Sequence, residues 1–216
     1  MTARDEILGR VRQGVGKDGF AQRKAAAQAL LAARERGPQP VLAGDLAKRF
    51  RAKAESLSST VDTVPDRRAA PAAVARYIAA QNLRPEIVMT PDVADLAWGG
   101  NGLQGVARAA VDADRIGVTA CFCAVAETGT LMLLSAPDSP ATVSLLPETH
   151  IALVDTSRIV ATMEDAFALL RAERGEIPRA INFVSGPSRT GDIEQTIVLG
   201  AHGPCRVHLI LIGTPS

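Results

Sequence analysis

The sequence predicts a single-domain α/β fold, an open and mostly parallel sheet flanked by helices, and three observations support this prediction. The 216 residues are 47% hydrophobic and 22% charged, which is ordinary for a chain that folds around a core. Short apolar runs of strand length alternate, from about residue 45 onward, with segments of helical periodicity. The longest purely apolar run, residues 120–126, is far below the ~20 residues that span a bilayer, so we expect no membrane span.

Residues 1–40 are expected to form a loosely packed helical arm, separate from an α/β domain of residues 41–216. Apolar residues recur at helical spacing over 7–11, and glycines soon interrupt the pattern. A second helical stretch over 21–36 is rich in alanine and arginine, and it ends at Gly37-Pro38-Gln39-Pro40. With few apolar anchors, this arm is expected to be peripheral or to bind a partner.

The elements of residues 41–216 follow in order. Asp45 can cap a helix, a second helix is expected over 71–82, and a short strand follows over 87–89. The remaining elements are strands over 130–135, 151–155, 180–184 and 207–213, and a helix over 162–172. Strands that alternate with helices predict a sheet covered by helices.

The net charge of +1 is unevenly distributed. Residues 1–76 carry 15 basic and 8 acidic side chains, and residues 77–216 carry 9 and 15. A basic front half can attract nucleic acid, but aromatic residues make up only 3% of the chain, so platforms for base stacking are scarce. We expect no nucleic-acid partner. Arg4, Asp5 and Glu6 stand where the apolar stretch of an export signal would begin, which predicts a cytoplasmic location.

The cysteines and the glycine-rich segment do not indicate a cofactor. Cys121, Cys123 and Cys205 are too few for the four thiolates of an ordinary iron–sulfur cluster, and their spacing with nearby histidines matches no tetrahedral metal site. Residues 14–19 match the G-x-G-x-x-G dinucleotide pattern, but they follow a polar helical segment instead of a buried strand. We therefore expect neither a metal nor a redox cofactor in this chain.

The first loop that carries chemistry is Glu127-Thr128-Gly129-Thr130, between an apolar run and a strand. A carboxylate beside a core run suits a general base or an acyl-accepting nucleophile, and Gly129 allows the backbone to approach a ligand closely. Glu127 is therefore a candidate catalytic residue, and the other three are candidate binding residues. The alternative is a hairpin whose polar side chains only satisfy backbone groups.

The second loop, residues 185–194, follows the strand over 180–184 and is expected at a carboxyl end of the sheet, where ligands bind. Ser188 or Thr190 can cap a following helix, whose first amides attract an anion, and Arg189 offers a planar fork for a carboxylate. The alternative is a capped surface turn with a solvated arginine. The candidate binding residues of this loop are Ser185, Gly186, Ser188, Arg189, Thr190, Asp192 and Glu194.

Three histidines complete the inventory. His202 lies in a glycine-bracketed turn before the last strand and is a candidate acid or base, although a backbone-bonded structural role is the alternative. His150 and His208, beside or within strands, are expected to be packing residues.

Taken together, the strings GVTACFCAVAETGTLMLL, SLLPETHIALVD and PRAINFVSGPSRTGDIEQTIVLGAHGP resemble the LUD-domain family, in particular its lactate-utilization protein C group. The resemblance spans roughly residues 40–213. Positions that match the family's motifs lie at 127–130, 185–190, 192, 194 and 202–204, and Gly191 departs from the alanine that is common in the family.

The resemblance implies a fold similar to the CoA-transferase and ribose-phosphate isomerase superfamily. It also implies a role in the oxidation of L-lactate to pyruvate, beside two iron–sulfur partner proteins. We therefore expect a subunit that binds a small carboxylate at the two loops, with Glu127 or His202 handling a proton and redox centres on partners. Whether the subunit is itself catalytic stays open. The alternatives are an independent acyl or formyl transferase or cyclo-ligase acting on CoA or folate, and a non-catalytic scaffold whose basic arm docks an acidic partner.

Overall fold

The computed structural model describes residues 2–16, 19–33, 35–193 and 196–213, without the side chains of residues 192–197. The chain divides into two compact units, Met1–Pro40 and Val41–Ser216. The first unit holds α1 (Ala3–Val15) and α2 (Phe20–Ala33), and neither helix, both fully within the described ranges, has a buried residue. α1 begins after Thr2, which exchanges hydrogen bonds with Asp5 in a capping box.

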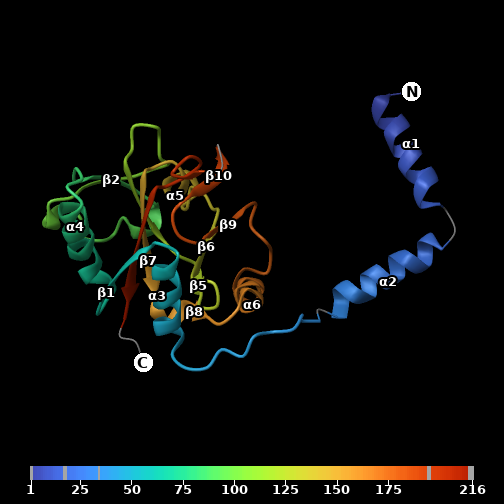
Figure 1. The fold of residues 1–216 in the computed structure, drawn as a ribbon, viewed down its shortest axis with the longest axis horizontal. Coiled ribbons are helices and arrows are strands. Elements are labelled where there is room, and N and C mark those ends of the chain that lie inside the picture. The colour runs from blue at the N-terminus through green and yellow to red at the C-terminus, as the bar shows by residue number, and fades with distance from the viewer. Residues whose placement is uncertain (1, 17–18, 34, 194–195, 214–216) are drawn as a thin grey trace. The chain divides into compact units, whose positions relative to one another are not determined.

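A six-stranded sheet forms the centre of the second unit, and every neighbouring pair of its strands is parallel. The order across the sheet is β1 (Thr60–Val64), β12 (Arg206–Ile212), β7 (Thr149–Asp155), β4 (Ile116–Ala120), β2 (Glu86–Met89) and β3 (Gln104–Ala107). Figure 1 labels β1, β2 and β7 of this sheet. The residues of β7 and β12 are buried almost without interruption, as expected for parallel strands that are covered on both faces.

Helices and a second sheet cover the two faces of this central sheet. The helices on the central sheet are α3 (Leu46–Ser56), α4 (Ala70–Ala80) and α5 (Thr142–Leu145), and α6 (Met163–Arg174) covers the second sheet. Ile151 of β7 packs with Val74 of α4 on one face, and the next residue, Ala152, packs with Phe50 of α3 on the other. This alternation follows from the twofold period of a strand.

The second sheet is four-stranded and mixed, in the order β8 (Ile159–Val160), β5 (Cys123–Val125), β6 (Thr130–Leu134) and β9 (Ile181–Val184). Leu131 of β6 joins the cluster that contains Phe50, and Met132 faces the opposite way, toward Leu170 of α6. The second sheet therefore lies between the central sheet and α6. A separate antiparallel hairpin consists of β10 (Arg189–Ile193) and β11 (Thr196–Leu199).

The predicted fold class is confirmed: the protein has a mostly parallel sheet flanked by helices. The helices expected over 71–82 and 162–172 and the five expected strands agree with the structure to within two residues at each end. Asp45 caps α3, because its carboxylate accepts hydrogen bonds from the amides of Ala47 and Lys48 at 2.8 and 3.3 Å. His150 and His208 are buried, as expected for packing residues. No described helix is long and apolar enough to cross a membrane.

Candidate functional site

The two loops singled out in the sequence meet in the structure. β6 follows the first loop and β9 precedes the second, and the two strands pair antiparallel with Leu131 opposite Val184. At the start of this pairing the Thr130 hydroxyl lies 2.6 Å from the Ser185 hydroxyl, within hydrogen-bond distance. Residues separated by 55 positions in the sequence are thus brought into direct contact.

Both loops also pack against the C-terminal end of α3. Gly129 and Gly186 have positive φ values of 64° and 77°. A Cβ atom on Gly129 would lie 2.7 Å from the Ala54 amide nitrogen, and one on Gly186 would collide with the Leu57 carbonyl oxygen. Glycine is needed at both positions for this close approach. We call residues 127–130, residues 185–189 and residues 53–58 at the end of α3 the α3-end cluster.

Arg189 is anchored within the α3-end cluster. Its Nη2 donates to the Leu57 carbonyl at 2.9 Å and to the Ser58 hydroxyl at 2.6 Å. The first bond satisfies a carbonyl that a helix end leaves without an intrahelical partner. Ser58 itself has a φ of 70°, which is unusual for a residue other than glycine. The guanidinium has five N–H donors, so this anchoring leaves Nε and Nη1 to face other groups.

Two premises of the anion site expected at residues 185–194 are wrong. Among the described residues no helix follows Ser188 and Thr190; β10 and β11 pair as an antiparallel hairpin, which suits the β-branched stretch at its end. The loop also lies beside the amino ends of the parallel strands, because Ser188 donates to the carbonyl of Pro204 just before β12. The carboxyl-end argument fails since β9 belongs to the second sheet and runs antiparallel to β6. The side chain of Asp192 and the whole of Glu194 lie outside the described residues.

The candidate catalytic residues occupy different surroundings. Glu127 is half-buried, and its amide donates to the Ala161 carbonyl at 3.0 Å. The buried hydroxyl oxygen of Thr128 has no hydrogen-bond partner within the described part of the chain. His202 is exposed on a cavity of about 590 Å³ whose wall contains no residue of the 127–130 turn. The structure thus joins the His202 turn to Ser188 through backbone hydrogen bonds, whereas Glu127 does not line the cavity that contains His202.

A different pocket, which the sequence did not indicate, lies at the carboxyl ends of the parallel strands. It has a volume of about 600 Å³ and is lined by residues 92, 120–122, 133–136, 138–139, 158, 173–174 and 176–178. We call it the carboxyl-edge pocket. Asp92 follows the end of β2, and residues 120–122 follow or end β4.

Strand order explains why a crevice forms there. β2 and β4 are neighbours, but the strand that follows β2 along the chain, β3, lies on one side of this pair, and the next central-sheet strand after β4, β7, lies on the other. Loops that depart in opposite directions leave a crevice between them, and open α/β sheets bind ligands at such switch points. The loop after β2 contributes Asp92 and the segment after β4 contributes Cys121 and Phe122.

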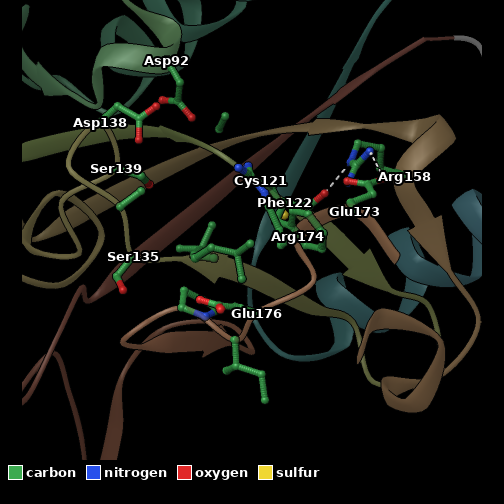
Figure 2. Close-up of a pocket in the computed structure, with 16 residues that line it drawn as sticks. Asp92, Cys121, Phe122, Ser135, Asp138, Ser139, Arg158, Glu173, Arg174 and Glu176 are labelled. Atoms are coloured by element: carbon green, nitrogen blue, oxygen red, sulfur yellow. Dashed lines mark hydrogen bonds and ion pairs between the residues drawn. The ribbon is translucent and has the colours of Figure 1, made fainter. Parts of the chain in front are cut away.

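One charged pair in the carboxyl-edge pocket is already satisfied. Arg158 binds Glu173 through two hydrogen bonds of 2.8 and 3.1 Å, and the bonds from Arg158 hold the pKa of the Glu173 carboxyl below its usual value. The same guanidinium donates to the Phe122 carbonyl and lies 4.8 Å from the centre of the Phe122 ring. Figure 2 shows this pair on one side of the pocket and Asp92 with Asp138 on the other.

The cysteines near this pocket are thiols of low reactivity. Burial raises the pKa of the Cys121 thiol, and it raises that of the Cys123 thiol to about 11. Within the described residues, no group of three or more histidine, cysteine or acidic side chains is placed to hold a metal ion.

Sequence reasoning missed the carboxyl-edge pocket, although one signal was available. Asp92 comes directly after Thr90-Pro91, at the end of the strand expected over 87–89, and such positions belong to the ligand edge of a parallel sheet. The other walls come from residues 133–139, 158 and 173–178, which only the strand order brings together.

Comparison with known proteins places this geometry in a family. The family model described as "LUD domain" matches residues 47–212. The chain is similar to a protein of Bacillus licheniformis named lactate utilization protein C, with 40% identity over 121 residues, which are 55% of this chain and 48% of that protein. A Bacillus subtilis protein of the same name is 41% identical over 100 residues, 45% of this chain and 42% of that protein. In these matches the chain covers about half the length of the curated relatives or less.

A solved structure shares the fold. The crystal structure of a DUF162 family protein from Deinococcus radiodurans superposes with a TM-score of 0.61 at 24% identity, covering 81% of this chain and 100% of that one. At this identity the similarity shows the fold alone.

Proposed function

The chain belongs to the LUD domain family, and on this premise we propose that it takes part in lactate utilization as a subunit that binds a small carboxylate at the α3-end cluster. The names of its relatives support the role in lactate utilization. The observation that carries the choice of site is the contact between the Thr130 and Ser185 hydroxyls, since it unites the two loops on which the family resemblance depends.

The geometry of Arg189 suits it to hold a carboxylate. Because Nη2 is fixed by Leu57 and Ser58, the plane of the guanidinium is set before a ligand arrives. Less conformational entropy is then lost when one of the remaining donors, Nη1 or Nε, donates to a carboxylate. The backbone of Lys53, whose side chain is exposed, also lies beside Gly129 at this helix end.

Glu127 would take the proton of the substrate hydroxyl in this proposal, as a half-buried carboxylate three residues from Thr130. Oxidation of a hydroxy acid to an oxo acid also breaks its C2–H bond, which releases two electrons and a second proton, and this proton passes to solvent. The proposal assigns these electrons to iron–sulfur centres on two partner subunits, so that this chain binds and orients the acid.

Calorimetry with L-lactate and with pyruvate tests the proposed site. We expect the wild-type chain to bind at least one of these acids and Arg189→Ala to bind it at least about tenfold more weakly, since a charge-assisted pair contributes on the order of 1.5–3 kcal/mol. Arg171→Ala, which removes an exposed arginine from α6, is the matched control and should bind like the wild type. Unchanged binding by Arg189→Ala, or no binding by the wild type, would show the site to be wrong.

A further inference from the structure

The carboxyl-edge pocket is too large for the small acid considered above. Its volume of about 600 Å³ lies within the ~300–1,000 Å³ range of pockets that enclose drug-sized ligands. A three-carbon acid would fill only a small part of it. Its place at the switch point between β2 and β4 is nevertheless the place where sheets of this kind bind ligands. The pocket therefore has the size and position of a binding site for something larger.

The charges on its wall disfavour an anion. Four acidic side chains line the pocket against two basic ones. Because Arg158 and Glu173 neutralise each other, three acidic side chains remain against a single cation, and these residues are Asp92, Asp138, Glu176 and Arg174. A ligand with negative charge would gain less from Arg174 than it would lose to the three carboxylates.

Asp92 and Asp138 define the polar end of the pocket. Figure 2 shows their side chains on the same wall, pointing toward one another, with Ser139 beside them. In the described part of the chain neither carboxylate takes part in an ion pair; only the backbone carbonyl of Asp92 is engaged, by Arg67. Two like charges that face each other without a cation between them favour a positively charged group.

Apolar side chains form another part of the wall. Leu133, Leu134, Ile177 and Pro178 line it together with Phe122. Such side chains bury the hydrocarbon part of a ligand and stabilise it by about 25 cal/mol for each Å² of apolar surface removed from water. The lining thus pairs an anionic end with an apolar body.

From this arrangement we propose that the carboxyl-edge pocket binds a small amphipathic amine, with its ammonium group between Asp92 and Asp138 and its apolar body against Phe122 and Ile177. This site is separate from the α3-end cluster and does not depend on the function proposed there. Nothing covalent occurs in this proposal; the ligand is held by charge, hydrogen bonds and burial.

A set of probes that differ only in charge tests the proposal. 2-Phenylethylamine, 2-phenylethanol and 3-phenylpropionate carry the same phenylethyl body with a cationic, neutral or anionic end. Amide chemical-shift titrations of the full chain would give an affinity for each probe and show which residues respond. We expect the amine to bind at least about tenfold more tightly than the carboxylate, with the alcohol between them, and the shifts to centre on residues 120–122 and 133–139.

Variants separate the role of the two carboxylates from that of the apolar wall. The double variant Asp92→Asn/Asp138→Asn should weaken amine binding at least about tenfold and leave the alcohol nearly unchanged, because it removes charge with little change of shape. Asp112→Asn, at an exposed aspartate outside the pocket, should bind all three probes like the wild type. The proposal is overturned if the amine does not bind, if the carboxylate binds as tightly as the amine, or if the double variant keeps wild-type affinity for the amine.

Discussion

Replacing Gly186 by alanine should destabilise the protein more than the same substitution at a glycine whose only constraint is a positive φ, because two separate costs apply at Gly186. The φ of 77° is left-handed, which costs an alanine ~1–2 kcal/mol. The added Cβ would also collide with the carbonyl oxygen of Leu57, and a forced shift of a packed backbone costs a further ~1–3 kcal/mol. Because the same carbonyl accepts the hydrogen bond from Arg189, the shift would disturb that anchor as well.

Gly102 offers a control in which only the first cost applies. It has a φ of 76° in the left-handed region, directly after the 3-10 helix Gly99–Asn101, and a Cβ there would meet no other atom within 4 Å. Gly102→Ala should therefore lose ~1–2 kcal/mol of unfolding free energy, and Gly186→Ala ~2–5 kcal/mol. The difference between the two variants isolates the contact with α3.

Equilibrium unfolding in urea, followed by the fluorescence of the single tryptophan, measures this difference. Trp98 is only 5% exposed and belongs to the core cluster between α4 and the central sheet, so its emission reports unfolding of the second unit. Equal loss of stability in the two variants would refute the reasoning, since it would mean that the 185–189 loop can move away from α3 without cost.

Three further predictions follow from the same contacts. Thr130→Val keeps the shape of the side chain but leaves the Ser185 hydroxyl without this partner, so the free energy of unfolding, measured in urea, should fall by ~1 kcal/mol. An unchanged free energy of unfolding would mean that water replaces the contact without cost. Burial lowers the pKa of His150 and His208 to about 4, below the 6.5 of an unfolded histidine, so the unfolded chain binds more protons than the folded chain between these two pH values. The free energy of unfolding should therefore be at its full value above pH 6.5 and lower by ~2 kcal/mol per histidine at pH 5. Equal midpoints of urea unfolding at pH 7 and pH 5 would contradict this prediction. If the proposed iron–sulfur partners exist, Glu127→Gln should abolish L-lactate oxidation by the assembled subunits while L-lactate still binds to the chain. Formyl or acyl transfer by the isolated wild-type chain would instead favour an independent enzyme.

Local signals in the sequence were sufficient to predict those elements in which the pattern of apolar residues matches the face that packs in the core. α6 has an apolar stripe and a Thr162 cap, and β7 is an apolar run bounded by polar residues, so both were predictable without knowledge of their neighbours. The hairpin of β10 and β11 was not, because Ser188 and Thr190 suit a helix cap as well as a strand. What decides between these conformations is the pairing of Arg189 with Leu199, which lies across the hairpin.

The candidate site shows the same division. That residues 127–130 and 185–189 meet depends on β6 pairing with β9, and no local pattern reveals the partner of a strand. The role of Arg189 changed for a similar reason: its fork was recognisable in the sequence, but its carbonyl partner is Leu57, 132 positions away. Predicting the carboxyl-edge pocket would require still more knowledge of the tertiary structure, because its walls come from both sheets and from the end of α6.

The two proposed sites lie at opposite ends of the parallel strands, one at their amino ends and one at their carboxyl ends. We therefore expect each site to bind its ligand independently of the other. Ser188 binds the backbone just before β12 begins, whereas Asp92 follows the end of β2. A strand of five residues, such as β4, is ~16 Å long at a rise of ~3.3 Å per residue, and charges at this separation are screened at physiological salt. Arg189→Ala should therefore keep wild-type affinity for 2-phenylethylamine, and Asp92→Asn/Asp138→Asn should keep wild-type affinity for L-lactate. If either variant weakened the binding of the other site's ligand by more than about twofold, the α3-end cluster and the carboxyl-edge pocket would be coupled. Their separation, inferred from the direction of the strands, would then be wrong.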